Sequence, residues 1–168
     1  MTTAMSRLQA LFLIFAITLL IAASAAIAFV PATRGDEKMS TDPWTAAQIL
    51  RPSDLARELN DKNEKSPTII YVGFHTLFAG GHIPGATFHG SASTEQGLAE
   101  LKKWADTLPR TASLVIYCGC CPFEKCPNIR PAFTALNGMG FKKLRVLVLP
   151  TNFATDWAGK RYPLEKGM

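Results

Sequence analysis

The sequence predicts a single α/β domain with a mainly parallel central sheet flanked by helices. Three short apolar runs, at residues 68–72, 113–117 and 144–149, are rich in β-branched residues and have the composition of buried strands. Helical patterns separate these runs, and strands that alternate with helices at short spacing are typical of a parallel sheet. About 135 residues follow the N-terminal segment, which is the usual size of one domain.

Local signals place the remaining elements. We expect a very short strand at residues 86–88 and helices at residues 54–59, 93–107, 129–137 and 153–158. Ser53 suits the N-cap of the first helix, and Ser93 with Gln96 resembles a capping box at the second. Pro131 is tolerated in the first turn of the third helix, which Gly138 ends.

Residues 1–30 read as a targeting segment. Their Ala-rich end contains two small-x-small triplets of the kind that precede signal cleavage. The apolar stretch 8–30 is also long enough to stay as a membrane anchor. In either case we expect residues 31–43 to be a linker and residues 44–168 to be the folded domain. That domain is expected to be exported and periplasmic or otherwise extracytoplasmic, either soluble or tethered.

The charge pattern excludes several classes of partner. The formal net charge is +5, and charged residues make up 18% of the sequence. There is no basic run and no interleaving of aromatic and basic residues, so we expect no nucleic-acid partner. Because a phosphate-binding loop and a dinucleotide fingerprint are both absent, we expect no cofactor. The mild positive balance suits small anionic ligands.

All four cysteines lie within nine positions, directly after the strand expected at residues 113–117. Cys118 follows that strand at once, and a helical pattern begins near Asn128. Sites in parallel sheets form at the carboxyl ends of strands, and a thiol that faces a helix N-terminus ionises more readily. Cys118 is therefore the candidate catalytic nucleophile.

The loop after Cys118 is a candidate cradle for an anionic substrate. Gly119 allows close approach of the backbone, and Lys125 and Arg130 offer positive charge beside the thiol. The candidate substrate-binding residues are Gly119, Cys120, Cys121, Lys125, Cys126, Asn128 and Arg130.

Three roles are open for the other cysteines. In the first interpretation, Cys126 or Cys121 resolves a persulfide or sulfenate on Cys118, as in a redox-cycled site. In the second, all four cysteines (Cys118, Cys120, Cys121 and Cys126) bind a soft metal ion, although their spacing is not that of two separated CxxC motifs. In the third interpretation two of them form a disulfide that shapes the loop.

The ordered motifs resemble those of the rhodanese-like sulfurtransferase domain over residues 47–165. Residues 81–86 read Gly-His-Ile-Pro-Gly-Ala, as in that family, and the strand that runs into Cys118 follows at the expected spacing. The resemblance implies that Cys118 takes sulfane sulfur from a small anionic donor such as thiosulfate, holds it as a persulfide and passes it to a thiophilic acceptor, either a thiol or a protein.

The sequence departs from the family pattern in three places. The family has Asp-Val-Arg where this chain has Tyr71, Val72 and Gly73. The cysteine loop is about five residues longer than in the family when the following helix is aligned at Gly140. Residues 151–152 replace a glycine pair. These departures keep two alternatives open. In the first, the domain is a non-catalytic rhodanese-fold module that binds a soft metal ion through the cysteine cluster. In the second, it is a thiol redox protein that uses the same cysteines.

Overall fold

The computed structural model describes residues 42–61, 63 and 65–167. The expected targeting segment, residues 1–30, and nearly all of the expected linker lie outside the described residues. Among the described residues, no helix is both long enough and apolar enough to cross a membrane.

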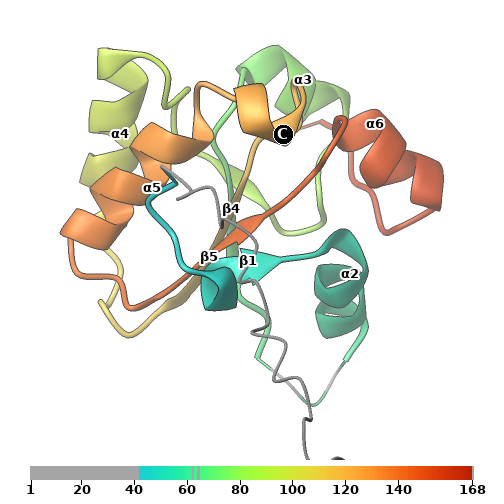
Figure 1. Cartoon of the computed structure of the whole chain (residues 1–168), viewed down its shortest axis with the longest axis horizontal. Coiled ribbons are helices and arrows are strands. Elements are labelled where there is room, and N and C mark those ends of the chain that lie inside the picture. Colours follow the sequence, from blue (N-terminus) through green and yellow to red (C-terminus); the bar gives the residue numbers. More distant parts are fainter. Residues whose placement is uncertain (1–41, 62, 64, 168) are drawn as a thin grey trace, which may run out of the picture. The chain divides into compact units, whose positions relative to one another are not determined.

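A five-stranded parallel sheet forms the centre of the domain, and its strand order is β1-β5-β4-β2-β3 (Figure 1). The strands are β1 (Ile49–Leu50), β2 (Thr68–Tyr71), β3 (Thr87–Phe88), β4 (Ser113–Tyr117) and β5 (Lys143–Leu147). β4 is central and pairs with β2 on one side and β5 on the other. The predicted α/β fold with a mainly parallel sheet is confirmed.

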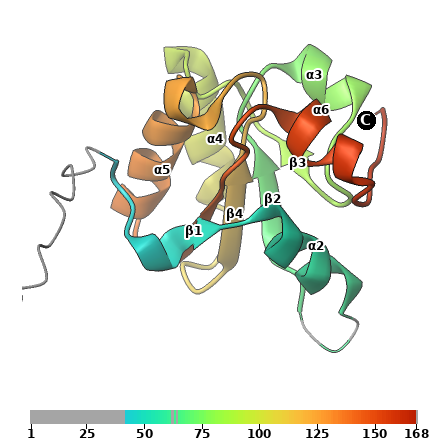
Figure 2. The same ribbon diagram turned by 45° about the vertical axis from the view of Figure 1, so that its right-hand side comes forward.

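Helices cover both faces of this sheet, as Figure 2 shows. The helices are α2 (Pro52–Asn60), α3 (His75–Gly80), α4 (Glu95–Ala105), α5 (Ile129–Gly138) and α6 (Phe153–Asp156), with 3-10 turns η1 (Ala46–Gln48), η2 (Phe123–Lys125) and η3 (Ala158–Lys160). α4 and α5 lie on one face, and α2, α3 and α6 lie on the other (Figures 1 and 2).

The alternation of side chains along β4 explains why it is buried on both faces. Leu114 and Ile116 belong to the apolar cluster under α4 and α5, whereas Val115 and Tyr117 belong to the cluster on the opposite face. All four side chains are fully buried. Cys118 continues the first series, so the strand carries its side chain toward the α5 face at the carboxyl end of the sheet.

Two helix starts differ from the predictions. Arg51, not Ser53, is the N-cap of α2, because Pro52 occupies the first helical position. Thr94, not Ser93, caps α4, and its hydroxyl accepts a hydrogen bond from the Gly97 N–H at 3.0 Å. Both helices form where they were expected, so the fold is unaffected.

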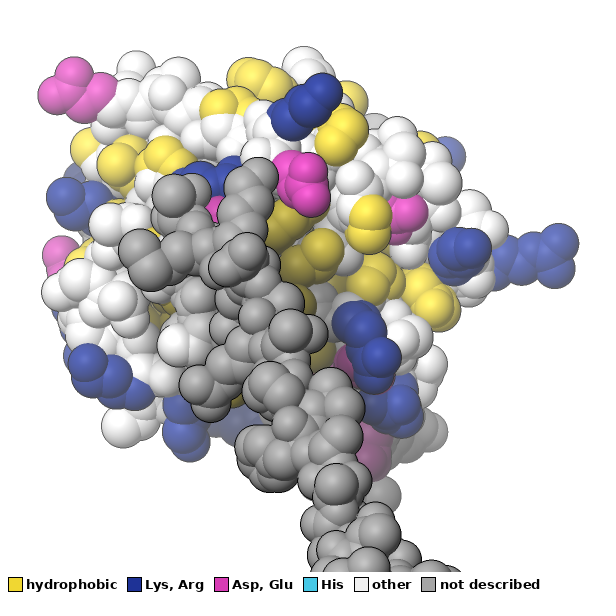
Figure 3. Space-filling view, in the orientation of Figure 1, with side chains coloured by type: hydrophobic (Ala, Val, Ile, Leu, Met, Phe, Trp, Pro, Cys, Tyr) yellow, Lys and Arg dark blue, Asp and Glu magenta, His cyan; other side chains and the backbone are white. Residues whose placement is uncertain are grey.

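Charged side chains are dispersed over the face drawn in Figure 3. Lys and Arg side chains lie at several separate places around its edge and form no continuous patch there.

Candidate active site

A cavity of about 420 Å³ opens at the carboxyl end of β4. Its walls come from α3, from α6 and the segment after it, and from the start of the cysteine loop. The lining residues are Tyr71, Thr76, Leu77, Gly80, Gly81, Cys118, Gly119, Cys120, Asn152, Phe153, Ala154, Ala158 and Leu164. The volume is in the range of small-molecule sites.

The turn at residues 81–86 holds one wall of this cavity in place. His82 and Glu165 form an antiparallel bridge in which each backbone N–H donates to the other's carbonyl at 2.9 Å. The buried His82 ring also stacks on Phe78, and its Nδ1 lies 2.9 Å from the Phe78 carbonyl oxygen. This bridge fixes Leu164 at the cavity wall. The motif therefore acts through structure, by attaching the C-terminal segment to α3.

Cys118 is the residue that links β4 to the cavity. It follows the last residue of the strand, lines the cavity and is only 2% exposed. Gly119 comes next with φ of +89°, a left-handed conformation that favours glycine. The Gly119 carbonyl accepts a hydrogen bond from the Phe153 N–H at 3.0 Å, which joins the loop to the opposite wall.

The four thiols converge, although the sequence spreads them over nine positions. The Sγ atoms of Cys118, Cys120 and Cys126 all lie within 4.8 Å of one another. Cys120 Sγ is 3.3 Å from Cys118 Sγ and 3.3 Å from Cys121 Sγ. All four cysteines are free thiols in this structure. The loop-shaping disulfide therefore stays a prediction.

Within the cluster, the pKa of one cysteine is lowered and the pKa values of two neighbours are raised. The pKa of Cys126 is lowered to about 6, chiefly by a hydrogen bond from the Cys118 thiol and further by the backbone N–H groups of Asn128 and Ile129 at the start of α5. The pKa of Cys118 is raised, because its proton is shared with Cys126 and because burial disfavours the charged form. Burial likewise raises the pKa of Cys121 to about 12.

The lowered pKa of Cys126 makes it the thiol of the cluster that most readily carries negative charge. The Cys118 thiol donates to Cys120 Sγ at 3.3 Å, and Cys118 receives two donors of its own, from the Cys120 N–H and from Asn128 Nδ2 at 3.5 Å. The helix N-terminus that was expected to activate Cys118 acts first on Cys126. Sequence spacing does not reveal this arrangement, because it does not specify which of two nearby thiols lies at the helix axis.

The charge on Cys126 predicts a pH-dependent contribution to stability. Because its folded-state pKa is lowered from 9.0 to about 6, the unfolded chain binds more protons between these pH values, and stability rises with pH across this window. Cys118 and Cys121 keep their protons in the folded state across this window but begin to ionise in the unfolded chain as the pH approaches 9.0, so they oppose the effect only at its upper end.

We expect the free energy of unfolding of the wild type, relative to Cys126→Ser, to increase from pH 6 to pH 9, the interval between the two pKa values. Urea unfolding of the reduced, chelator-treated protein measures it. Parallel pH profiles for the two proteins would contradict the assignment of the thiolate to Cys126.

Asn128 is a buried bridge and not an exposed part of an anion cradle. It is the N-cap of α5 and is fully buried. Its Oδ1 accepts hydrogen bonds from Ser93 N–H at 2.9 Å and Ser91 Oγ at 3.0 Å, while its Nδ2 donates to Cys118 Sγ. The side chain thereby ties the segment before α4 to the cysteine cluster.

Removing the Asn128 amide should destabilise the domain. We expect Asn128→Leu to cost about 1–3 kcal/mol, because two donors lose their acceptor. Asn137→Ala is the matched control, since Asn137 is exposed on the same helix and its replacement should change stability by less than about 0.5 kcal/mol. Chemical denaturation of both variants measures the difference, and equal shifts would contradict the bridging role.

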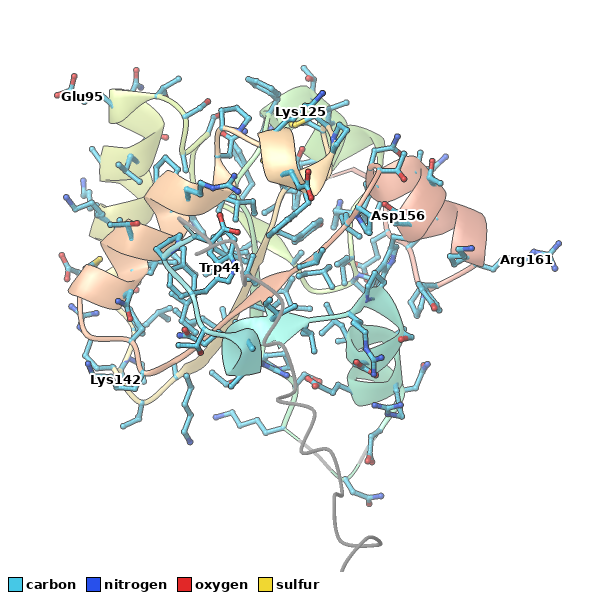
Figure 4. All side chains as sticks on the ribbon, in the orientation of Figure 1. Trp44, Glu95, Lys125, Lys142, Asp156 and Arg161 are labelled. Atoms are coloured by element: carbon cyan, nitrogen blue, oxygen red, sulfur yellow. The ribbon has the colours of Figure 1, made fainter. Side chains whose placement is uncertain are left out.

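The two candidate cations lie away from the thiols. Lys125 is exposed on η2, as Figure 4 shows, and does not line the cavity. Arg130 pairs with Asp42 at 2.6 Å, donates to the Glu124 carbonyl at 3.2 Å and lies over the Trp44 ring. Arg130 therefore anchors the cysteine loop to the start of the domain.

Two residues next to Cys118 were not singled out from the sequence. Tyr71 lines the cavity, and Gly73 lies close to both the Tyr71 hydroxyl and Cys118 Sγ. A Cβ added at Gly73 would lie 2.5 Å from the Tyr71 hydroxyl and 2.8 Å from Cys118 Sγ, so a side chain has no room there. The replacement of the family's Asp-Val-Arg is thus coupled to the packing of Tyr71 against Cys118. A glycine directly after a buried strand was the only available signal.

The cysteine cluster is also the group of residues that could hold a metal ion. A soft ion with bonds of about 2.3 Å to each thiolate keeps its sulfur ligands about 3.8 Å apart. The sulfur atoms of Cys118, Cys120 and Cys126 approach this spacing. In the part of the chain that the structure describes, these three cysteines are the one group of three or more potential metal ligands that lie close together.

Comparison with solved structures identifies proteins of similar fold. The chain aligns with the rhodanese-like domain of an Anabaena protein at 22% identity and a TM-score of 0.53, covering 71% of this chain and 79% of that one. A Bacillus halodurans protein aligns at 16% identity and a TM-score of 0.55, with coverages of 70% and 76%. A Lactobacillus plantarum protein gives 14% identity, a TM-score of 0.52, and coverages of 71% and 88%. The sequence matches no protein-family model and no curated protein.

The domain therefore has the rhodanese fold, with a cysteine-rich loop at the carboxyl end of its central strand. The resemblance that the motifs suggested is confirmed at the level of the fold.

Proposed function

We propose that the protein is a sulfurtransferase in which Cys118 carries sulfane sulfur as a persulfide. One observation carries the proposal: Cys118 is the thiol at the end of β4 that also lines the cavity, whereas Cys121 and Cys126 do not line it. Sulfur that enters the cavity meets this thiol and Cys120. Of the two, Cys118 is held by the central strand and by Asn128, which fixes its orientation.

The reaction begins with attack of the Cys118 sulfur on the sulfane sulfur of the donor. As the new S–S bond forms, the donor's own bond to that sulfur breaks, and the leaving group keeps the electron pair. The proton of Cys118 passes to the neighbouring Cys126 thiolate, whose sulfur lies within 4.8 Å. An acceptor thiol then attacks the outer sulfur of the persulfide and restores Cys118.

The lining of the cavity favours a donor of low charge. Among the described residues that line it, there is no Lys, Arg, His, Asp or Glu. Desolvating a dianion such as thiosulfate there has to be compensated by neutral donors, namely backbone N–H groups and the side chains of Tyr71, Thr76 and Asn152. An organic persulfide carries its reactive sulfur on an apolar stem that suits Leu77, Phe153 and Leu164. We therefore propose organic persulfides as the better donors, with a small thiol or a protein thiol as acceptor.

Sulfur transfer from the two donors tests this function. The reduced protein is incubated anaerobically with either cysteine persulfide or thiosulfate, and sulfur transferred to cyanide is measured as thiocyanate. We expect transfer from both, with kcat/KM higher for the persulfide by about tenfold or more, the discrimination that apolar contacts typically provide. Absence of transfer from both donors, above the rate without protein, would overturn the proposed function.

A soft-metal site in the same cluster is the second candidate, and the sulfur separations of the cluster favour it. Protein purified anaerobically without chelator distinguishes the candidates. Copper, zinc or iron in stoichiometric amount, lost in Cys120→Ser, together with no sulfur transfer after its removal, would favour the metal module.

The cellular location remains part of the proposal. The apolar, Ala-rich character of residues 1–30 supports export to an extracytoplasmic compartment, with residues 8–30 as a membrane attachment if they are retained. Cell fractionation of the full chain, with the N-terminus of the mature protein sequenced, tests both points. Recovery of the intact chain from the cytoplasm would overturn them.

A further inference from the structure

We propose that Cys126 resolves the persulfide on Cys118, so that the site reduces sulfane sulfur to hydrosulfide and forms a Cys118–Cys126 disulfide. This inference rests on the proposed function, because it needs a persulfide on Cys118. It adds a second activity, the release of hydrosulfide, and assigns a role to a cysteine that simple sulfur transfer does not use.

The positions of the two cysteines relative to the cavity support the inference. Cys118 lines the cavity, so the outer sulfur of its persulfide extends into that space. Cys126 is 3% exposed, does not line the cavity and packs in the same buried cluster as Cys118. Thiol–disulfide exchange requires the attacking sulfur to approach opposite the leaving one. A thiol that lies close to Cys118 but outside the cavity wall suits that approach, because the outer sulfur of the persulfide extends into the cavity.

Chain separation and sulfur positions together favour Cys126 over its neighbours. A disulfide between Cys118 and Cys120 would close a very small ring with strained geometry. Cys121 stands at CxxC spacing from Cys118, which permits a disulfide, but it is not one of the three cysteines whose sulfur atoms all lie within 4.8 Å of one another. Cys126 is eight positions beyond Cys118, and the intervening chain consists of turns and η2 instead of a sheet strand. The two sulfur atoms already lie within 4.8 Å, and a bond of about 2 Å requires only a local shift of this loop.

The chemistry balances without an external oxidant. The Cys126 thiolate attacks the inner sulfur of the Cys118 persulfide, the new S–S bond forms, and the bond to the outer sulfur breaks. The outer sulfur leaves with the electron pair, takes a proton from water and departs through the cavity as hydrosulfide. Two thiol sulfurs are oxidised to the disulfide, and one sulfane sulfur is reduced. A dithiol reductant must then reopen the disulfide before the next cycle.

A single-turnover experiment tests the inference. Reduced full-length protein, freed of reductant, is mixed anaerobically with one equivalent of cysteine persulfide. Free thiols are then blocked with iodoacetamide, and the protein is analysed by mass spectrometry. We expect about one hydrosulfide per chain above the protein-free control, and a Cys118–Cys126 disulfide in the peptide map. Cys126→Ser should instead keep the added sulfur, with a mass increase of about 32 Da, and release no hydrosulfide.

Comparison variants separate the possible failures. Cys121→Ser should still form the disulfide, and accumulation of persulfide in Cys121→Ser but not in Cys126→Ser would assign resolution to Cys121 and overturn the inference. A persulfide that persists in the wild type without hydrosulfide release also overturns it, while the proposed function stands. If neither protein acquires sulfur, the proposed function itself fails. Because the disulfide is mapped in the wild type, the test remains decisive even if Cys126→Ser folds poorly.

Discussion

We expect Cys118→Ser to lower the rate of sulfur transfer by about three orders of magnitude or more, because a neutral hydroxyl is a poor nucleophile toward sulfur and cannot hold a persulfide. The fold should survive, since serine is close in size to cysteine and the side chain ends a strand whose pairing is through the backbone. Thiocyanate formation from cysteine persulfide measures the rate, and circular dichroism checks the fold.

Ser113→Ala is the control for this substitution, since Ser113 begins β4 at the end remote from the cavity. It should transfer sulfur at the wild-type rate. Cys120→Ser provides the contrary test, because Cys120 also lines the cavity. Transfer that survives in Cys118→Ser but disappears in Cys120→Ser would identify Cys120 as the sulfur carrier.

Gly119→Ala should both destabilise the domain and disturb the site. At φ of +89° an alanine costs about 1–2 kcal/mol, because its Cβ approaches the backbone in the left-handed region. The same Cβ would also lie 2.7 Å from Phe153 Cβ and 3.0 Å from Leu149 Cδ1, so α6 must shift. Together we expect a loss of about 2–5 kcal/mol in the free energy of unfolding, measured by urea denaturation.

Gly138→Ala is the matched control for Gly119→Ala. Gly138 lies in the last turn of α5, and a Cβ added there meets nothing within 4 Å. Alanine should be neutral or stabilise the protein by up to about 1 kcal/mol, because it favours the helix. If both alanine variants were equally stable, neither the strained loop nor its contact with α6 would constrain the site.

Much of the fold was predictable because it depends on local patterns. The runs at β2, β4 and β5 are apolar and β-branched, and α5 begins and ends within one residue of its expected limits. β1 has only two residues, which is too short to produce a periodic pattern. α3 was not among the predicted helices, because its glycine-rich end masks a helix of only six residues.

The site was predictable only in part, because its contacts join residues far apart in the chain. The position of Cys118 follows from the end of β4, and that much was expected. The ion pair of Arg130 with Asp42 joins residues that are 88 positions apart in the chain, so the positive charge that we expected beside the thiol is paired with a carboxylate. Asn128 reaches Ser91 across 37 positions. Such partners depend on how the layers pack, which the local pattern does not encode.

The cysteine loop shows the same limit. The sequence singled out Cys118 but left the roles of Cys120, Cys121 and Cys126 open, whereas the fold distinguishes Cys120 at the cavity from Cys126 at the start of α5. The glycine at position 73 has a similar explanation, since the Tyr71 hydroxyl and Cys118 Sγ occupy the space of its missing side chain. Two of the departures from the rhodanese pattern, at Gly73 and in the cysteine loop, therefore meet at Cys118.

The most direct test of the central claim is to locate the transferred sulfur by mass spectrometry. Cys126→Ser protein, in which we expect the persulfide to persist, is loaded with cysteine persulfide under anaerobic conditions, blocked with iodoacetamide and digested. The account predicts one added sulfur atom, about 32 Da, on Cys118 and none on Cys120 or Cys121. Sulfur found mainly on Cys120, or no added sulfur on any cysteine, would contradict it.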